Sequence, residues 1–120
     1  MKTIGLVLPY DFKLFSVASV LDVFETLNGL YLRKSKELPF KLLLVQSGQQ
    51  ILLTGKSFLG YPVFSIRSNL KLDIVIIPSF TSTDLNETIE KNKLFIPWLH
   101  KQFNAGAEIA SLCTGAFLFA

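Results

Sequence analysis

The sequence predicts a single α/β domain in which a parallel sheet is covered by helices on both faces. Short apolar runs alternate along the chain with segments whose apolar residues recur every three or four positions. The runs at residues 40–45 and 72–77 are apolar almost throughout, as is typical of strands that are buried on both faces. A length of 120 residues allows one such domain.

The first unit is predicted to be a strand, a turn and a long helix. Residues 3–8 form a short apolar run that ends at Pro9, and the turn follows at residues 9–11. Gly29 lies near the expected end of the helix, and basic residues follow it, as helix carboxyl ends prefer. The residues expected on the buried face of the helix are Leu14, Val17, Leu21, Phe24, Leu27 and Tyr31.

The middle of the chain is predicted to supply two further strands and a small hairpin. After the strand at residues 40–45, short apolar runs at 51–53 and 61–64 are flanked by Gly55 and Gly60, which indicates a hairpin or an edge excursion. The strand at residues 72–77 is rich in β-branched residues and ends at a proline.

The last third is predicted to be a polar loop, a helix and a final strand. The loop covers residues 79–90, and Pro97 requires the following helix either to start late or to bend. Gly106 is expected to end that helix, before a strand at residues 107–112. The apolar residues at helical spacing are Leu94, Phe95, Trp98, Leu99 and Phe103.

Composition excludes several classes of function. The net charge of +3 comes from scattered basic residues, apart from a cluster at Arg33, Lys34 and Lys36, and this pattern favours solubility over nucleic-acid binding. No apolar run approaches a membrane span and no signal peptide is recognisable, so we expect a cytoplasmic protein without a membrane partner. With one cysteine and one histidine and no phosphate-binding glycine motif, we expect no intrachain disulfide, no cofactor and no closed metal site.

Three loops are expected to meet at the carboxyl edge of the sheet. They cover residues 9–12, 78–83 and 113–115, and each follows a predicted strand. Ligands and chemistry gather at this edge in open parallel sheets, so it is the predicted location of the functional site.

The segment at residues 110–116, Ala-Ser-Leu-Cys-Thr-Gly-Ala, has the pattern of a nucleophile turn between a strand and a helix. Such a turn would expose the Cys113 thiol at a helix N-terminus, where the helix dipole favours a thiolate. The backbone N–H groups of Thr114 and Gly115 could then act as oxyanion donors. The alternative is that Cys113 is an inert cysteine packed in the core.

Three pieces of sequence resemble the ThiJ/PfpI superfamily, whose fold is the flavodoxin-like, class I glutamine amidotransferase-like three-layer sandwich. They are residues 110–118 around Cys113, residues 73–78, and the first helix with Phe12, Leu14, Ala18 and residues 21–24. The segment around Cys113 most resembles the N-terminal domain of AraC-type transcriptional regulators. In that branch Cys-Thr-Gly replaces the Cys-His pair of the protease-like branch.

The resemblance also identifies departures from active enzymes. Ser79 and Phe80 stand where the family usually has Gly-Gly, and Ser16 stands where active members carry an acidic residue. Thr114 occupies the place of the adjacent histidine. The resemblance implies that Cys113 is the candidate nucleophile. The residues expected to line a ligand pocket are Asp11, Ser16, Ser79, Phe80, Thr114 and Gly115.

Three other ionisable residues have simpler interpretations. Asp11 lies in a loop that faces the site, but a cap of the first helix is its favoured interpretation, and Asp22 fits the polar face of that helix. His100 lies in the last predicted helix, towards the opposite side of the sheet, where a solvent-facing or core role is favoured over a catalytic one. Acyl transfer at Cys113 would therefore lack a base.

Three functions remain open. The resemblance favours a non-catalytic sensor of an unidentified small molecule, homodimeric, which acts on DNA only through a domain outside these residues. The second is a stand-alone cysteine enzyme, an amidase, isonitrile hydratase or glyoxalase-like protein. The third is a redox responder in which Cys113 is oxidised reversibly. Because residues 116–120 resemble a helix that has only begun, we also expect residues 1–120 to be the N-terminal part of a longer ThiJ/PfpI-like domain.

Overall fold

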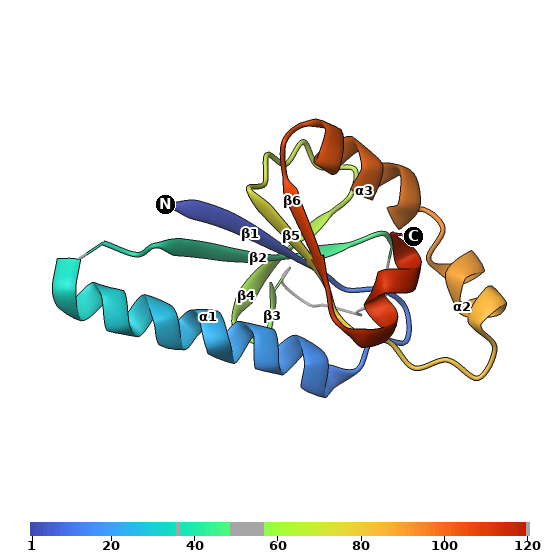
Figure 1. Ribbon diagram of the computed structural model, residues 1–120, viewed down its shortest axis with the longest axis horizontal. Helices are drawn as coiled ribbons and strands as arrows, with labels where there is room; N and C mark the ends of the chain where they lie inside the picture. Colours follow the sequence, from blue (N-terminus) through green and yellow to red (C-terminus); the bar gives the residue numbers. More distant parts are fainter. Residues whose placement is uncertain (36, 49–56, 120) are drawn as a thin grey trace.

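A six-stranded sheet with helices on both faces forms the domain, as predicted (Figure 1). The computed structural model of the protein describes residues 1–35, 37–48 and 57–119. The strand order is β3-β4-β2-β1-β5-β6, and all neighbours are parallel except the β3–β4 pair. The strands are β1 (Lys2–Val7), β2 (Phe40–Gln46), β3 (Ser57–Phe58), β4 (Tyr61–Ser65), β5 (Ile74–Ile77) and β6 (Glu108–Ser111). The helices are α1 (Leu14–Ser35), α2 (Leu85–Lys91), α3 (Phe95–Asn104) and the short 3₁₀ helix η1 (Cys113–Leu118).

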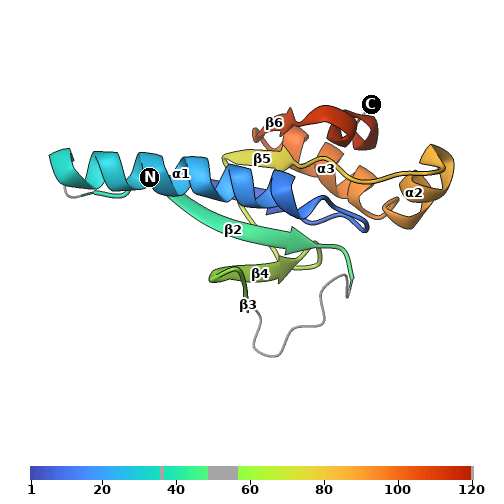
Figure 2. The ribbon, with the colours of Figure 1, turned by 90° about the horizontal axis from the view of Figure 1, so that it is seen from below.

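Alternate side chains of the central strands belong to two hydrophobic cores, one on each face of the sheet. On β2, Leu42 and Leu44 join the core under α1, whereas Leu43 and Val45 join the core under α3. Side chains of a strand alternate between the two faces of the sheet, so both sides must be covered, as the apolar sequence of β2 predicts. Figures 1 and 2 show α1 on one face and α3 on the other.

Helix α1 is longer than the sheet it covers, and its buried face is shorter than predicted. Val17 and Leu21 are buried as expected, but Leu14 is 56% exposed and Tyr31 is 51% exposed. The side chain of Asn28 bonds both backbone groups of Phe40, with distances of 2.9 and 3.0 Å, where β2 begins. Beyond this contact the helix continues past Gly29 to Ser35 without a strand beneath it, so the expected end near Gly29 is wrong.

The predicted edge hairpin exists in part. Strands β3 and β4 are antiparallel and joined by Leu59 and Gly60, which both have positive φ (54° and 84°), as in the tight turns of two-residue hairpins. Residues 51–53 and Gly55, which were expected to contribute, lie outside the described residues.

The polar segment at residues 79–90 is not entirely a loop, because it contains most of α2. The Asp84 side chain accepts a hydrogen bond from the Glu87 N–H at 3.3 Å and so caps the helix. Asp84 and Glu87 have the spacing of a helix start, a local signal that the polar composition obscured.

Pro97 and Gly106 act as predicted at the two ends of α3. Pro97 lies in the first turn, so the helix starts late rather than bending. After Asn104 the N–H groups of Gly106 and Ala107 bond the carbonyls of Phe103 and Gln102, at 3.1 and 3.0 Å. Gly106 has φ of 105°, and this pairing is a Schellman motif.

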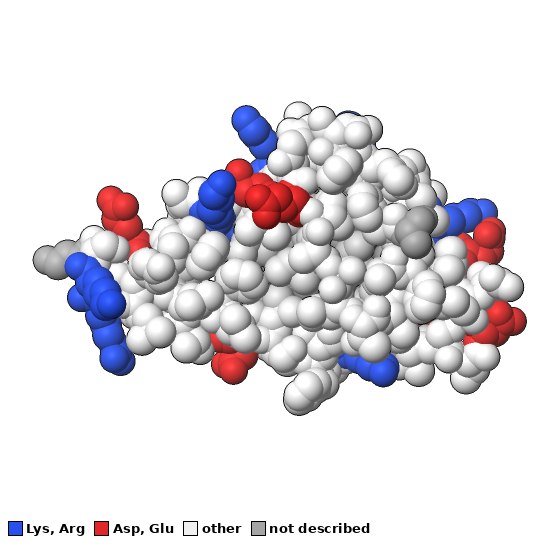
Figure 3. All heavy atoms as spheres, in the orientation of Figure 1, with Lys and Arg blue, Asp and Glu red and all other residues white. Residues whose placement is uncertain are grey.

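Charged side chains are dispersed on the face shown in Figure 3. Lysine and arginine side chains are separated there by uncharged surface, which fits the scattered basic residues of the sequence. Among the described residues, no helix has the length and apolar character needed to span a bilayer.

Two glycine substitutions should have opposite effects on stability. Gly29→Ala should stabilise by roughly 0.5–1 kcal/mol, because Gly29 lies in a helix and an added Cβ meets open space. Gly106→Ala should destabilise by about 1 kcal/mol or more, because alanine is strained at positive φ. Urea unfolding measures both, and equal effects of the two substitutions would contradict the assignment of the helix ends.

Candidate functional site

The elbow, as the turn of residues 112–115 is called, joins β6 to the short helix η1. Leu112 is extended, and Cys113, the first residue of η1, has φ of 50°. Positive φ is uncommon for a residue with a side chain and persists where the surrounding structure enforces it. Cys113 is exposed, so the alternative of a buried, inert core cysteine is wrong.

Gly115 allows the elbow to approach the end of β5. A Cβ atom at this position would lie 2.6 Å from both the Ile77 and the Pro78 carbonyl oxygens. The Leu112 N–H donates to the same Ile77 oxygen at 2.9 Å. Only glycine fits between η1 and this backbone, so Gly115 is a structural requirement of the turn.

Residues 79–81 form a loop beside the elbow in which every backbone N–H already has a protein partner. The Ser79 N–H donates to Ser16 Oγ at 3.0 Å, and the Phe80 N–H donates to Thr114 Oγ1 at 2.9 Å. The Thr81 N–H donates to the Asp11 carbonyl at 2.9 Å. This short segment therefore ties together α1, the elbow and the turn after β1.

Most of the backbone N–H groups that could stabilise an oxyanion already donate hydrogen bonds to protein acceptors. The Gly115 N–H donates to the Leu112 carbonyl at 2.9 Å within the turn, so the expectation that it serves an oxyanion is wrong. Of the two predicted donors, the Thr114 N–H remains. A tetrahedral intermediate is normally stabilised by donors aimed at its oxygen, and the 79–81 loop has none to spare.

Most of the residues expected to line a ligand pocket are instead buried in this junction. Ser16, Ser79, Phe80 and Gly115 are buried, and Thr114 is half-buried. The Thr114 hydroxyl also donates to the Phe80 carbonyl at 2.9 Å, so this side chain satisfies both backbone groups of Phe80. The structure brings the predicted residues together, and their direct role in ligand binding stays a prediction.

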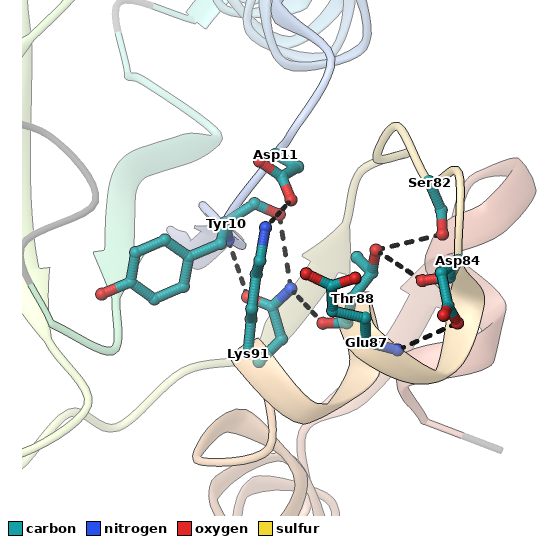
Figure 4. Close-up of polar contacts among 8 residues, drawn as sticks. Tyr10, Asp11, Ser82, Asp84, Glu87, Thr88 and Lys91 are labelled. Atoms are coloured by element: carbon teal, nitrogen blue, oxygen red, sulfur yellow. Dashed lines mark hydrogen bonds and ion pairs between the residues drawn. The ribbon is translucent and has the colours of Figure 1, made fainter.

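Asp11, in the turn after β1, faces α2 (Figure 4). Its carboxylate pairs with Lys91 Nζ at 2.9 Å, and the hydrogen bond and charge of Asp11 raise the pKa of Lys91. Helix α1 starts only at Leu14, and the Asp11 side chain is paired with α2, so the favoured interpretation of Asp11 as a helix cap is wrong.

Between Asp11 and α2 lies a polar cleft of about 380 Å³. Hydroxyl groups and carboxylates line it. The Thr88 hydroxyl lies 3.0 Å from Ser82 Oγ and 3.1 Å from the Asp84 carbonyl (Figure 4). The lining residues are Asp11, Phe12, Thr81, Ser82, Thr83, Asp84, Glu87, Thr88 and Lys91.

Asn92, which the sequence does not single out, holds this cleft in shape. It is fully buried; its Oδ1 accepts from the Tyr10 N–H at 2.7 Å, and its amide donates to the Thr88 carbonyl at 3.0 Å. The contact spans 82 positions of sequence, which a local pattern cannot reveal.

No base for Cys113 is evident in the described part of the chain. The thiol makes no hydrogen bond there, and no group of three or more histidine, cysteine, aspartate or glutamate residues could hold a metal ion. His100 is exposed and stacks on Phe119, with ring centroids 5.1 Å apart. Asp22 is exposed on α1, as predicted.

The fold is the three-layer α/β fold of DJ-1 superfamily proteins. A crystal structure of a candidate transcriptional regulator from Vibrio parahaemolyticus superposes with a TM-score of 0.72 at 19% identity, over 98% of this chain. A mutant of a DJ-1 superfamily protein from Salmonella typhimurium superposes with a TM-score of 0.59 at 17% identity, over 97% of this chain. This chain spans 59% and 57% of those two chains. No protein-family model and no curated protein sequence matches it.

Removing the Thr114 hydroxyl should loosen the junction. Thr114→Val leaves the N–H and the carbonyl of Phe80 without their partner, which should cost about 1–3 kcal/mol of stability. Thr114→Ser keeps the hydroxyl and serves as the matched control. Urea unfolding of both variants checks this, and similar losses for valine and serine would show that the hydroxyl does not hold the loop.

Proposed function

We propose that the chain is the ligand-sensing, amidotransferase-like domain of an AraC-type transcriptional regulator and that it is not catalytic. The fold and the likeness to a candidate transcriptional regulator support this proposal. The ligand would be a small molecule held at the carboxyl edge of the sheet, near Cys113 and the 79–81 loop. DNA would be bound by a domain outside residues 1–120, in the cytoplasm.

The observation that carries the proposal is that the backbone N–H groups of the 79–81 loop already donate hydrogen bonds within the protein. Ser16 accepts from the Ser79 N–H and Thr114 accepts from the Phe80 N–H, so the loop offers neither N–H to an oxyanion. Catalysis at a cysteine also requires a base within hydrogen-bond reach, and none faces Cys113 among the described residues. A rigid junction without these groups suits binding better than turnover.

A homodimer is part of the same proposal. Leu112 and Phe117 beside the elbow are 39% and 50% exposed, and the middle of the face in Figure 3 is uncharged. Within the described residues, β6 lies at one edge of the sheet. Where the rest of the longer domain leaves it uncovered, such a surface favours association with a second copy, which sedimentation equilibrium measures directly.

Two alternative functions would depend on the exposed thiol of Cys113. A stand-alone cysteine enzyme would need a histidine and a carboxylate near the thiol. A redox responder would form a sulfenic acid that a neighbouring carboxyl group would normally stabilise, and Ser16 stands where that carboxyl group would lie. An unchanged protein mass after mild peroxide treatment would remove the redox alternative.

Sequencing the coding DNA beyond the codon for Ala120 tests the proposal. We expect the reading frame to continue through the rest of the domain into a helix-turn-helix DNA-binding region. A frame that instead completes the domain, adds a histidine and then stops would contradict the proposal and favour an enzyme. A stop codon directly after Ala120 would also contradict it.

A further inference from the structure

A second hollow, remote from Cys113 in sequence, lies between α1 and the β3–β4 hairpin. It has a volume of about 520 Å³, within the range of sites for small molecules. Phe15, Leu21 and Leu59 are among its apolar lining residues, and Phe15 is 85% exposed. None of the residues expected to form the site at the elbow lines this groove.

One wall of the groove is acidic, and it forms no ion pair with any residue that the structure describes. Asp22 and Glu25 lie one helical turn apart on α1, so their carboxylates are neighbours and repel each other. The ion pairs among the described residues join Lys91 to Asp11 and Lys93 to Glu90, and neither involves this pair. Lys41 lines an adjoining hollow together with Glu25 but forms no ion pair with it.

Tyr61 places an aromatic ring and a fixed hydroxyl on the hairpin side of the groove. Its phenol donates a hydrogen bond to the Glu25 carboxylate. Partial burial, this hydrogen bond and the negative charges of Glu25 and Asp22 raise the pKa of Tyr61 to about 12. The hydrogen bond from the phenol holds the Glu25 carboxylate at the groove.

We propose that this groove binds a small organic cation with an apolar body. An ammonium or guanidinium group would lie between Asp22 and Glu25, where it relieves their repulsion and gains charge-assisted hydrogen bonds. The aromatic rings of Phe15 and Tyr61 favour a cation at their faces and an apolar group beside them. The proposed ligand therefore carries a cationic group and an apolar group in one molecule.

The probe is phenethylammonium at pH 7, compared with 2-phenylethanol, which has the same apolar body without the charge. Titration of ¹⁵N-labelled chain, followed by NMR, should give saturable shifts at Asp22, Glu25 and Tyr61 with a dissociation constant in roughly the millimolar range. The alcohol should bind at least about tenfold more weakly.

Matched variants distinguish the contribution of the acidic side chains to binding from that of the apolar lining. Asp22→Asn should weaken binding of the amine about tenfold, because one charge-assisted contact is lost. Glu90→Gln makes the same change of charge on α2, outside the groove, and should leave the affinity unchanged. Phe15→Ala should weaken the amine and the alcohol alike.

Three results would overturn the proposal. One is equal affinity for the amine and the alcohol, and another is saturable shifts confined to the cleft beside Asp11. The third is a dimer that Phe15→Ala dissociates while the amine causes no shifts, which would make the groove a contact between copies of the chain.

Discussion

The close contact between Gly115 and the carbonyl groups of Ile77 and Pro78, at the end of β5, fixes the position of the elbow. Because no Cβ intervenes, η1 lies against the Ile77 and Pro78 oxygens, and Thr114 reaches the backbone of Phe80. The same loop then bonds Ser16 on α1 and the backbone of Asp11 after β1. One short backbone segment therefore sets the geometry of all three loops at the carboxyl edge of the sheet.

This arrangement has a chemical consequence. Buried backbone N–H groups need partners, and side-chain hydroxyls from Ser16 and Thr114 supply them here. A protein of the same fold with glycines in this loop and an acid on α1 could leave its donors open for a substrate. In this chain the hydroxyls close the same positions, so an exposed cysteine at positive φ lies beside a loop with no free donor.

Much of the fold follows from the sequence because its signals are local. Alternating apolar runs and helical periodicity predict the strands β1, β2, β5 and β6, and Pro97 and Gly106 predict the ends of α3. Helix α2 was missed because its polar composition resembles a loop, although Asp84 and Glu87 carry a capping signal. The buried face of α1 was overestimated because periodicity cannot show that the helix extends beyond β2.

The site is less accessible to sequence reasoning, because its defining contacts join residues far apart in the chain. The Ser16–Ser79 pair spans 63 positions and the Tyr10–Asn92 pair spans 82. The sequence predicts which residues gather at the carboxyl edge, since strand order places them there. The sequence could not predict that these residues would hydrogen-bond to one another, because such bonds depend on distances of a few tenths of an ångström.

Turnover of an activated ester tests the central claim most directly, because p-nitrophenyl acetate needs no specific pocket. The wild-type chain and Cys113→Ala would be compared for p-nitrophenol released per molecule of protein. The closed loop predicts that wild type releases at most about one equivalent above the variant, from simple acylation of the exposed thiol. Sustained release of many equivalents that depends on Cys113 would show that an oxyanion donor and a base are present, and would contradict the account.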